Sequence, residues 1–448
     1  MLKIFTAIFY RFRVGLYLYT LPLLVMLYTM PVQGQELVLS GKVRSAGGGQ
    51  AVAFANIGIN GYAIGTVSNE RGEFELHFPE KFAEDSLQVS CIGYYAYAAP
   101  IADLLAMEPV QIALVPRAYS LETVTITPND LSAGEIVKRA MQHIPDNYIV
   151  DPYLMDGFYR EYFKENGTYA AFAEAAVSIY DPMGYLPNMN KPAETVKVNQ
   201  LRVSDICNKG KYVLYIDVNF ALRGNLLRNS EFWQLFARQT KTGVERLNTD
   251  SVMYDGKQPV YCIGYVLESK KSGTYRGRLF IRKTDYAVLR VEIAADNLPD
   301  GREGNGAPYR SKAVMTYKEY NGKLYLNYVN ASHDVFYYDY ETQQRYDLNF
   351  YAELTINNIS TKGVTPLPEN TRAKQSSIFY HPRYRTYDPQ YWQTYNLFET
   401  SPANIQIIAD LERQRPLKEQ YAANGKLKYT GNEPYESDYY HEGYRYRH

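Results

Sequence analysis

Short runs of alternating apolar and polar residues fill the chain from residue 36 to residue 114, and turn residues separate them. In GEFELHF the apolar Phe74 and Leu76 are predicted to point inwards, and three polar residues, Glu73, Glu75 and His77, to point outwards. Asn69 can open the preceding tight turn and Gly72 can end it with a positive φ. Regular short strands with such turns predict a β-sandwich. The glycines of this stretch do not form a phosphate-binding loop, so we interpret residues 52–76 as structural.

A helix is predicted after the sandwich, at LSAGEIVKRAMQHIPDNY. Ser132 and Glu135 are spaced as a capping box, and Pro145 ends the pattern. One apolar face is formed by Ile136, Val137, Ala140, Met141 and Ile144. This linking helix, within residues 128–149, is expected to dock onto the next sheet.

From residue 150 the pattern changes to long strands joined by tight turns. Asn166-Gly167 and Asn321-Gly322 each lie between two strand-like runs, and Asn-Gly is a strong hairpin signal. In RYDLNFYAELTIN one side of the strand is apolar: Tyr346, Leu348, Phe350, Ala352, Leu354 and Ile356. The other side is expected to be wet and includes Tyr351 and Glu353. The apolar face needs a cover, either helices at residues 229–237 and 401–414 or a lipid.

The two ends of the chain differ from the rest. Lys3, Arg11 and Arg13 precede an apolar run at residues 14–30, which predicts a signal peptide cleaved after Gly34, with an uncleaved membrane anchor as the alternative. Residues 416–448 are polar and rich in tyrosine and are expected to be a disordered tail. The resulting division is a signal peptide (1–34), a β-sandwich (35–127), a linking helix (128–149), a β-rich module (150–415) and a polar tail (416–448).

Charge and composition narrow the function. Lys and Arg number 48, as do Asp and Glu, so the chain lacks the basic excess typical of a nucleic-acid-binding protein. The chain holds 45 tyrosines, which favour strands and half-wet surfaces. The fold is therefore predicted to be mainly β.

Four motifs within residues 38–127 resemble the carboxypeptidase-regulatory-like domain of exported Bacteroidota proteins. They are Gly41 to Val43, Phe54-Ala55-Asn56-Ile57, Gly65-Thr66 through Gly72 to Phe74, and Ile92-Gly93-Tyr94. The resemblance implies a transthyretin-like (prealbumin-like) sandwich and an exported protein. It implies no peptidase chemistry, because the domain is named after the enzymes it accompanies.

The larger part, residues 150–415, resembles the β-rich module of a poorly characterised Bacteroidota family through phrases such as YDPQYWQTYNLFETSP. That resemblance transfers no catalytic residue. It is compatible with an antiparallel meander, as a curved sheet or half-barrel with a few helices, whose shape is similar to that of periplasmic lipoprotein carriers. A small outer-membrane β-barrel is an alternative, although charges on both faces of RGRLFIRK weigh against it.

Three sets of residues were considered for chemistry. His77 and Glu80 have the H-x-x-E spacing of two zinc ligands, but Pro79 prevents one helical face and no second histidine has a matching context. Cys207 and Cys262 can form a disulfide or be small buried side chains. Glu161 and Glu174, on neighbouring strands, are the candidate carboxylate pair of a hydrolase.

The sequence thus predicts no catalytic residue, no metal ligand and no cofactor. The leading interpretation is an exported, non-enzymatic binding or scaffolding protein in the periplasm or at the outer membrane. Its expected partner is an envelope protein, a glycan or a lipid. A carrier of a lipophilic ligand, a hydrolase and a small barrel are the alternatives.

Overall fold

The computed structural model describes residues 36–107, 109–117, 131–185, 194–207, 221–222, 225–228, 230–241, 246–269, 273–296, 308–373, 387–393 and 402–426. The predicted signal peptide with its cleavage after Gly34, the segment 118–130 and residues 427–448 lie outside these ranges.

The N-terminal domain consists of two small sheets that enclose one apolar core. One sheet has the order β4-β1-β7 and the other β3-β2-β5-β6. The strands are β1 Glu36–Ser45, β2 Asn56–Ile59, β3 Gly65–Val67, β4 Glu73–Pro79, β5 Ser86–Ser90, β6 Tyr97–Pro100 and β7 Val110–Leu114, with η1 Glu80–Phe82 and α2 Ile101–Leu105. The inward residues Phe74 and Leu76 are 2% and 1% exposed, as predicted. The predicted sandwich is confirmed.

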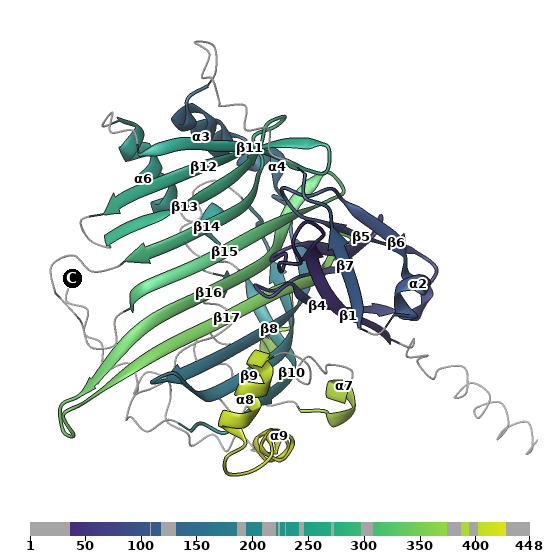
Figure 1. The fold of residues 1–448 in the computed structure, drawn as a ribbon, viewed down its shortest axis with the longest axis vertical. Coiled ribbons are helices and arrows are strands. Elements are labelled where there is room, and N and C mark those ends of the chain that lie inside the picture. Colours follow the sequence, from purple (N-terminus) through teal and green to yellow (C-terminus); the bar gives the residue numbers. More distant parts are fainter. Residues whose placement is uncertain are drawn as a thin grey trace, which may run out of the picture.

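A ten-stranded antiparallel sheet forms the larger module, in the order β10-β9-β8-β17-β16-β15-β14-β13-β12-β11 (Figure 1). Its strands are β8 Tyr153–Glu165, β9 Thr168–Asp181, β10 Thr195–Val203, β11 Leu247–Asp255, β12 Gln258–Ser269, β13 Gly273–Arg282, β14 Val288–Asp296, β15 Pro308–Tyr320, β16 Lys323–Asp339 and β17 Gln344–Ser360. The sheet is open, with β10 and β11 at its two edges, so the closed barrel considered from the sequence is wrong.

The tight turns form where the Asn-Gly pairs predicted them. Asn166 and Gly167 join β8 to β9 with φ angles of 49° and 80°, and Asn321 and Gly322 join β15 to β16 with 50° and 74°. Both turns therefore have the two positive φ angles of a type I′ hairpin, which matches the twist of the flanking strands.

One face of the sheet, here called the inner face, is apolar from edge to edge. A single cross-strand row runs from β12 to β10, and every member is at most 2% exposed: Ile263, Leu279, Val291, Met315, Val329, Leu354, Tyr159, Ala175 and Leu201. At about 25 cal/mol per Å² of buried apolar surface, this row is a major part of what stabilises the module.

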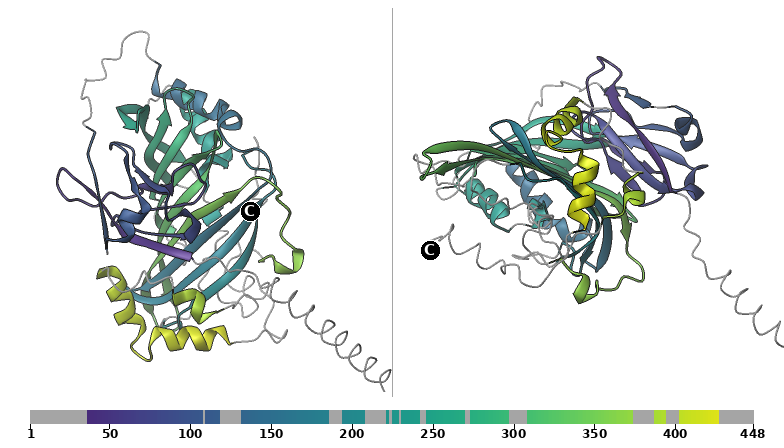
Figure 2. Two further views of the ribbon diagram at one scale, coloured as in Figure 1. Left: turned by 90° about the vertical axis from the view of Figure 1, so that its right-hand side faces the viewer. Right: turned by 90° about the horizontal axis from the view of Figure 1, so that it is seen from below.

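Helices lie within the curve of the sheet on this inner face (Figure 2). They are α3 Ala133–Gln142, α4 Ile144–Asn147 and α6 Ser230–Lys241, with η2 Leu226–Arg228 beside them. The Ser132 hydroxyl accepts the Glu135 N–H at 3.2 Å, so the predicted N-terminal cap of α3 is present. Pro145 ends α3 as expected, but it also occupies the first turn of α4, where a missing N–H costs nothing.

Three C-terminal helices pack at the β8–β10 end: α7 Pro389–Gln393, α8 Pro402–Leu411 and α9 Leu417–Gly425, after η3 Glu369–Thr371. Leu417 and Tyr421 of α9 form one apolar cluster with Phe172 of β9. The disordered tail predicted from residue 416 is therefore wrong for residues 417–425, because these two side chains supply enough burial to fix the helix. No helix in the described ranges has the length and apolar character needed to cross a membrane.

The N-terminal domain docks on the opposite face of the sheet, here called the outer face. The Phe54 ring lies 5.7 Å from the Tyr328 ring of β16, and Asn327 donates to Asn56 Oδ1 at 2.6 Å. At a second point, the Gly93 N–H donates to Tyr254 O of β11 at 2.8 Å. Residues of two of the four family motifs thus make these contacts between the two modules.

The polar side of β4 differs from the sequence prediction. Glu75 and His77 of β4 were expected to point into solvent, but they line a small cavity of about 50 Å³ together with Arg160 and Glu353 of the large sheet. The polar side of β4 is therefore an interface between modules.

Phe54 has a backbone conformation that is strained for a bulky residue, with φ of 61°. Ser68, fully buried, holds it in place: Ser68 O accepts the Phe54 N–H at 2.8 Å, and the Ser68 hydroxyl accepts the Ala55 N–H at 2.9 Å. The strain is maintained because the ring gains its contacts with the large sheet.

We predict that Phe54→Ala lowers the free energy of unfolding by about 3 kcal/mol, because it removes a buried aromatic ring without relieving the φ strain. Urea denaturation followed by the fluorescence of Trp233 and Trp392 measures the change. Tyr340→Ala, at a tyrosine that is 74% exposed, is the matched control and is expected to change stability little. An equal effect of both substitutions would contradict the anchoring role of Phe54.

Lys318 of β15 also joins the modules. Its ammonium group donates to Ala63 O of the N-terminal domain and to Ile356 O of β17, both at 3.1 Å, and the described residues offer it no carboxylate. Burial of the ammonium group lowers the pKa of Lys318 to about 7, although the residue as a whole is half-buried.

This pKa predicts how stability changes with pH. An unfolded lysine titrates near a pKa of about 10.4, so between pH 7 and pH 9 the unfolded chain binds more protons than the folded chain. The contribution of Lys318 to stability therefore rises with pH across this window. We expect the melting temperature of the wild-type protein to gain from this contribution as the pH rises. The melting temperature of Lys318→Met is expected to lack this gain. Thermal unfolding of both proteins at pH 7, 8 and 9 checks it, and parallel curves would refute it.

Candidate functional site

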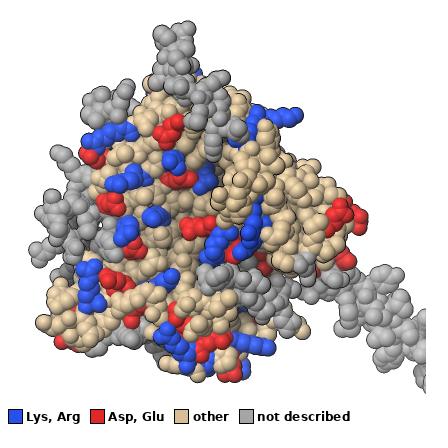
Figure 3. Space-filling view, viewed as in Figure 1, with Lys and Arg blue, Asp and Glu red and all other residues tan. Residues whose placement is uncertain are grey.

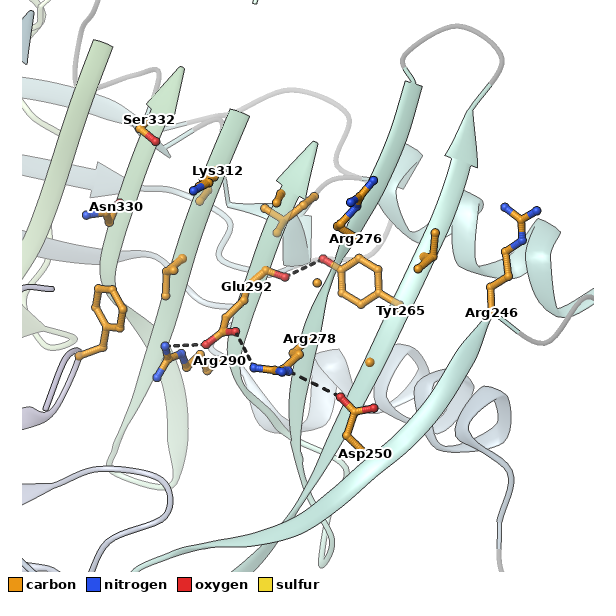
Figure 4. A pocket seen from close by; sticks show the side chains of 18 of the residues that line it. Arg246, Asp250, Tyr265, Arg276, Arg278, Arg290, Glu292, Lys312, Asn330 and Ser332 are labelled. Carbon is orange, nitrogen blue, oxygen red and sulfur yellow. Dashed lines mark hydrogen bonds and ion pairs between the residues drawn. The ribbon is translucent and has the colours of Figure 1, made fainter. Parts of the chain in front are cut away.

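An open hollow of about 970 Å³ lies on the outer face of the sheet, beside the N-terminal domain. Strands β11 to β16 form its floor, and Phe54 and Glu70 of the N-terminal domain form one wall (Figure 4). Because docking of the N-terminal domain covers only part of the outer face, the part that forms this hollow stays accessible.

Charged side chains of both signs line the hollow. The basic residues are Arg246, Arg276, Arg278, Arg290 and Lys312, and the acidic residues are Glu70, Asp250, Glu268 and Glu292. Figure 3 shows the same alternation of basic and acidic groups over the sheet beside the N-terminal domain. The site is therefore polar and close to balanced in charge.

Most of these charges form ion pairs, between strands or along one strand. Arg278 Nε lies 3.6 Å from Asp250 Oδ2, and Arg290 Nη2 lies 2.6 Å from Glu292 Oε1. Arg246 pairs with Glu268. Exposed pairs of this kind contribute at most about 1 kcal/mol each to stability. Their main effect is therefore to restrict the conformations of the long side chains around the hollow.

The middle of the floor is low because its residues are small. Gly264 on β12 and Ala294 on β14 lie in the floor, and a Cβ at Gly264 would come within 2.8 Å of the Asp250 carboxylate. A Cβ at Gly277, which would point to the inner face, would come within 2.7 Å of the Tyr265 hydroxyl, which donates to Glu292 O at 2.8 Å. Glycine at 277 thus lets the hydroxyl of Tyr265, whose ring packs against Phe236 of α6, reach β14.

Arg290 connects the hollow to the docked domain. Its guanidinium carbon lies 4.7 Å from the centre of the Phe54 ring and 5.4 Å from that of Phe280. Stacking on two rings, together with the ion pair to Glu292, fixes the arginine at the wall of the hollow. The strained Phe54 therefore anchors the domain and shapes the site.

A buried ionic network lies on the same outer face, between the hollow and the C-terminal helices. Arg160 Nε donates to Glu174 Oε1 at 2.7 Å, and Arg202 pairs with the other oxygen of Glu174, which is fully buried. Arg160 also pairs with Glu353 at 3.3 Å. Burial opposes the charge of Arg160, but Glu174 and Glu353 outweigh it and raise the pKa of the guanidinium.

The proposed carboxylate pair is wrong. Glu174 lies opposite Arg160 in the sheet, whereas Glu161 lies opposite Ala173, so the two glutamates point to opposite faces. The physical reason is a β-bulge at Ala170: without it, the two-residue turn at Asn166-Gly167 would place both glutamates on one face. Glu161 instead accepts a hydrogen bond from the Tyr159 hydroxyl at 2.9 Å on the inner face.

The remaining sequence candidates do not come together either. His77 pairs with Glu75 at 2.5 Å between Nε2 and Oε1, in the interface between the modules, and Glu80 belongs to η1. Cys207 and Cys262 are free thiols, Cys207 after β10 and Cys262 on β12, so the possible disulfide is not formed. Within the described ranges, His, Cys, Asp and Glu form no group able to hold a metal ion. The absence of catalytic residues, metal ligands and cofactors stays a prediction.

The residues of the hollow were not singled out from the sequence. A signal was present in RGRLFIRK, where Arg276 and Arg278 alternate with small or apolar residues on one strand. It indicated a charged sheet face, but not that strands β11 to β16 would bring several such residues around one hollow.

Comparison with known proteins identifies the N-terminal domain. Residues 39–126 match the model of the CarboxypepD_reg-like domain. Among curated proteins, none matches the sequence.

Several solved structures resemble part of the chain at low identity. A LolA superfamily protein from Nitrosomonas europaea is 9% identical, with 55% of this chain and 99% of that chain covered and a TM-score of 0.23. A DUF1329 family protein from Desulfovibrio piger is 9% identical (52% and 93% covered, TM-score 0.22). The MucA/MucB complex of Pseudomonas aeruginosa contributes a chain that is 9% identical (52% and 99% covered, TM-score 0.18). At TM-scores this low, the likenesses carry no weight for what the chain does.

We predict that Glu174→Gln destabilises the protein by about 3 kcal/mol, because it leaves two buried arginines without their shared carboxylate. Glu161→Gln, which keeps an acceptor for the Tyr159 hydroxyl, is the matched variant and is expected to cost no more than about 1 kcal/mol. Chemical denaturation of the two variants and the wild type measures both effects. A larger loss for Glu161→Gln would contradict a structural role centred on Glu174.

Proposed function

We propose that the protein is an exported, non-enzymatic binding protein of the cell envelope, which holds a polar ligand in the hollow beside its N-terminal domain. The observation that carries the proposal is the hollow itself, an open site of about 970 Å³ whose charged side chains are held upright by ion pairs. Such side chains form hydrogen bonds and ion pairs with a ligand without any chemical step.

Binding is favoured over hydrolysis by the arrangement of the acidic groups. Glu292 and Asp250 are each paired with an arginine, so both carboxylates are already engaged. Glu161 and Glu174, the pair proposed for acid–base chemistry, are separated by the sheet. The geometry therefore supports recognition of polar groups better than proton transfer.

A lipophilic ligand is less well supported. The inner apolar face is the natural place for one, but its central row is at most 2% exposed, and the aromatic residues of α6 pack against it, with Phe236 at 5.1 Å from the ring of Tyr265. A lipid could enter only if α6 moved away from the sheet.

Export is supported by the basic leader and apolar run of residues 1–34 and by the N-terminal domain. In this proposal the N-terminal domain is a scaffold: it builds one wall of the hollow through Phe54 and Glu70. Association with the outer membrane would occur through the bound partner.

A substitution that fills the hollow tests the proposal. Ala294, half-buried in the floor, is replaced by Trp, and Arg345→Trp on the same sheet outside the hollow is the control. Purified proteins are titrated with a panel of envelope glycans, peptides and phospholipid vesicles by biolayer interferometry. We expect at least one panel member to bind, Ala294→Trp to weaken it tenfold or more, and Arg345→Trp to leave it unchanged. Equal binding by all three proteins, or hydrolysis of the bound ligand, would overturn the proposal.

A further inference from the structure

One row of residues across the hollow places two basic side chains on either side of a small one. Arg276 on β13 pairs with Ala294 on β14, and Ala294 pairs with Lys312 on β15. Since neighbouring strands lie about 4.8 Å apart, the two basic residues originate about 10 Å apart on the same face. Figure 4 shows Arg276 and Lys312 rising from the strands that flank β14.

Lys312 differs from the other basic residues of the hollow. Its side chain is exposed, and no ion pair or hydrogen bond involves its ammonium group in the part of the chain that the structure describes. Arg276 is 57% exposed and pairs through Nη2 with Asp296, which is 60% exposed. An exposed pair of this kind is weak and leaves most of the guanidinium donors free.

Uncharged polar groups continue the same surface. Ser332 of β16 lies directly opposite Lys312, and its hydroxyl forms no hydrogen bond within the described part of the chain. Asn330, two residues earlier on β16, also lines the hollow. A ligand whose negative group lies above Ala294 would therefore meet a hydroxyl and an amide on the next strand.

We propose that the hollow binds an acidic glycan, with a negatively charged group of a sugar held between Arg276 and Lys312 above Ala294 and with sugar hydroxyl groups bonded to Ser332 and Asn330. This inference rests on the proposed function and names its ligand class. Charge is needed for recognition because the two aromatic residues that line the hollow are already engaged: the Phe54 ring is stacked on Arg290, and the Tyr265 ring packs against Phe236 of α6.

The acidic residues of the hollow favour a glycan over an acidic peptide. Asp250, Glu268 and Glu292 would repel a chain that carries a negative charge on every residue. Sugars with widely spaced negative charges avoid this repulsion, because their hydroxyl groups donate hydrogen bonds to carboxylates. The hollow, with its basic and acidic side chains, thus matches a polymer that carries both negatively charged groups and hydroxyl groups.

Four probes distinguish the possible ligands. They are hyaluronan oligosaccharides, with one carboxylate per disaccharide, neutral dextran of similar length, poly-glutamate and inorganic phosphate. We expect the wild-type protein to bind hyaluronan most tightly, with affinity that falls as salt is raised from 50 to 500 mM, because the contacts are exposed. Tighter binding of dextran, poly-glutamate or phosphate would overturn the inference.

Charge-removing variants then locate the contact. Arg276→Ala and Lys312→Ala are each expected to weaken hyaluronan binding about tenfold, Lys312→Arg to retain most of it, and Arg345→Ala, at an exposed residue outside the hollow, to have no effect. Unchanged unfolding midpoints confirm that the variants are folded. If Ala294→Trp abolishes binding while Arg276→Ala and Lys312→Ala do not, the hollow remains the binding site and the inference about the anionic group is wrong.

Discussion

The packing of Phe54 against the outer face of the large sheet is the contact on which the arrangement of the whole molecule depends. This ring lies on Tyr328 and Arg290, and its strained backbone is fixed by Ser68. It positions the N-terminal domain over one part of the sheet and leaves part of the outer face of strands β11 to β16 open as the hollow. The inner face needs no such contact, because α3, α4 and α6 of the same module cover it.

The features that could be predicted from the sequence are those set by neighbouring residues. Asn166-Gly167 and Asn321-Gly322 determine their own turns, Ser132 caps its own helix, and the alternation from Tyr346 to Ile356 identifies the buried side of β17. The features that were missed depend on distant partners. Glu353 was expected to face water, but it is buried because Arg160, 193 residues away, and the docked domain cover it.

One extra residue explains the largest error at the candidate site. The bulge at Ala170 shifts the register of β8 and β9, and with it the side on which each glutamate lies. Neither hydrophobic pattern nor turn type reveals such a bulge, since alanine fits either face. The helix at residues 417–425 was missed for a similar reason: its apolar anchors are Leu417 and Tyr421, its polar anchors Gln420 and Asn424 bond to residues outside the helix, and its composition is that of a polar tail.

The pairing of β8 with β17 in the middle of the large sheet has a consequence for how the chain reaches its native state. The strands from β8 to β10 form one local hairpin series and those from β11 to β17 another, and only this central pairing joins them. Closing so long a loop is slow, so the two halves can form early but must wait for each other with an unpaired edge exposed. If the chain folds only after crossing a membrane, this unpaired edge is exposed in the compartment where the two halves meet.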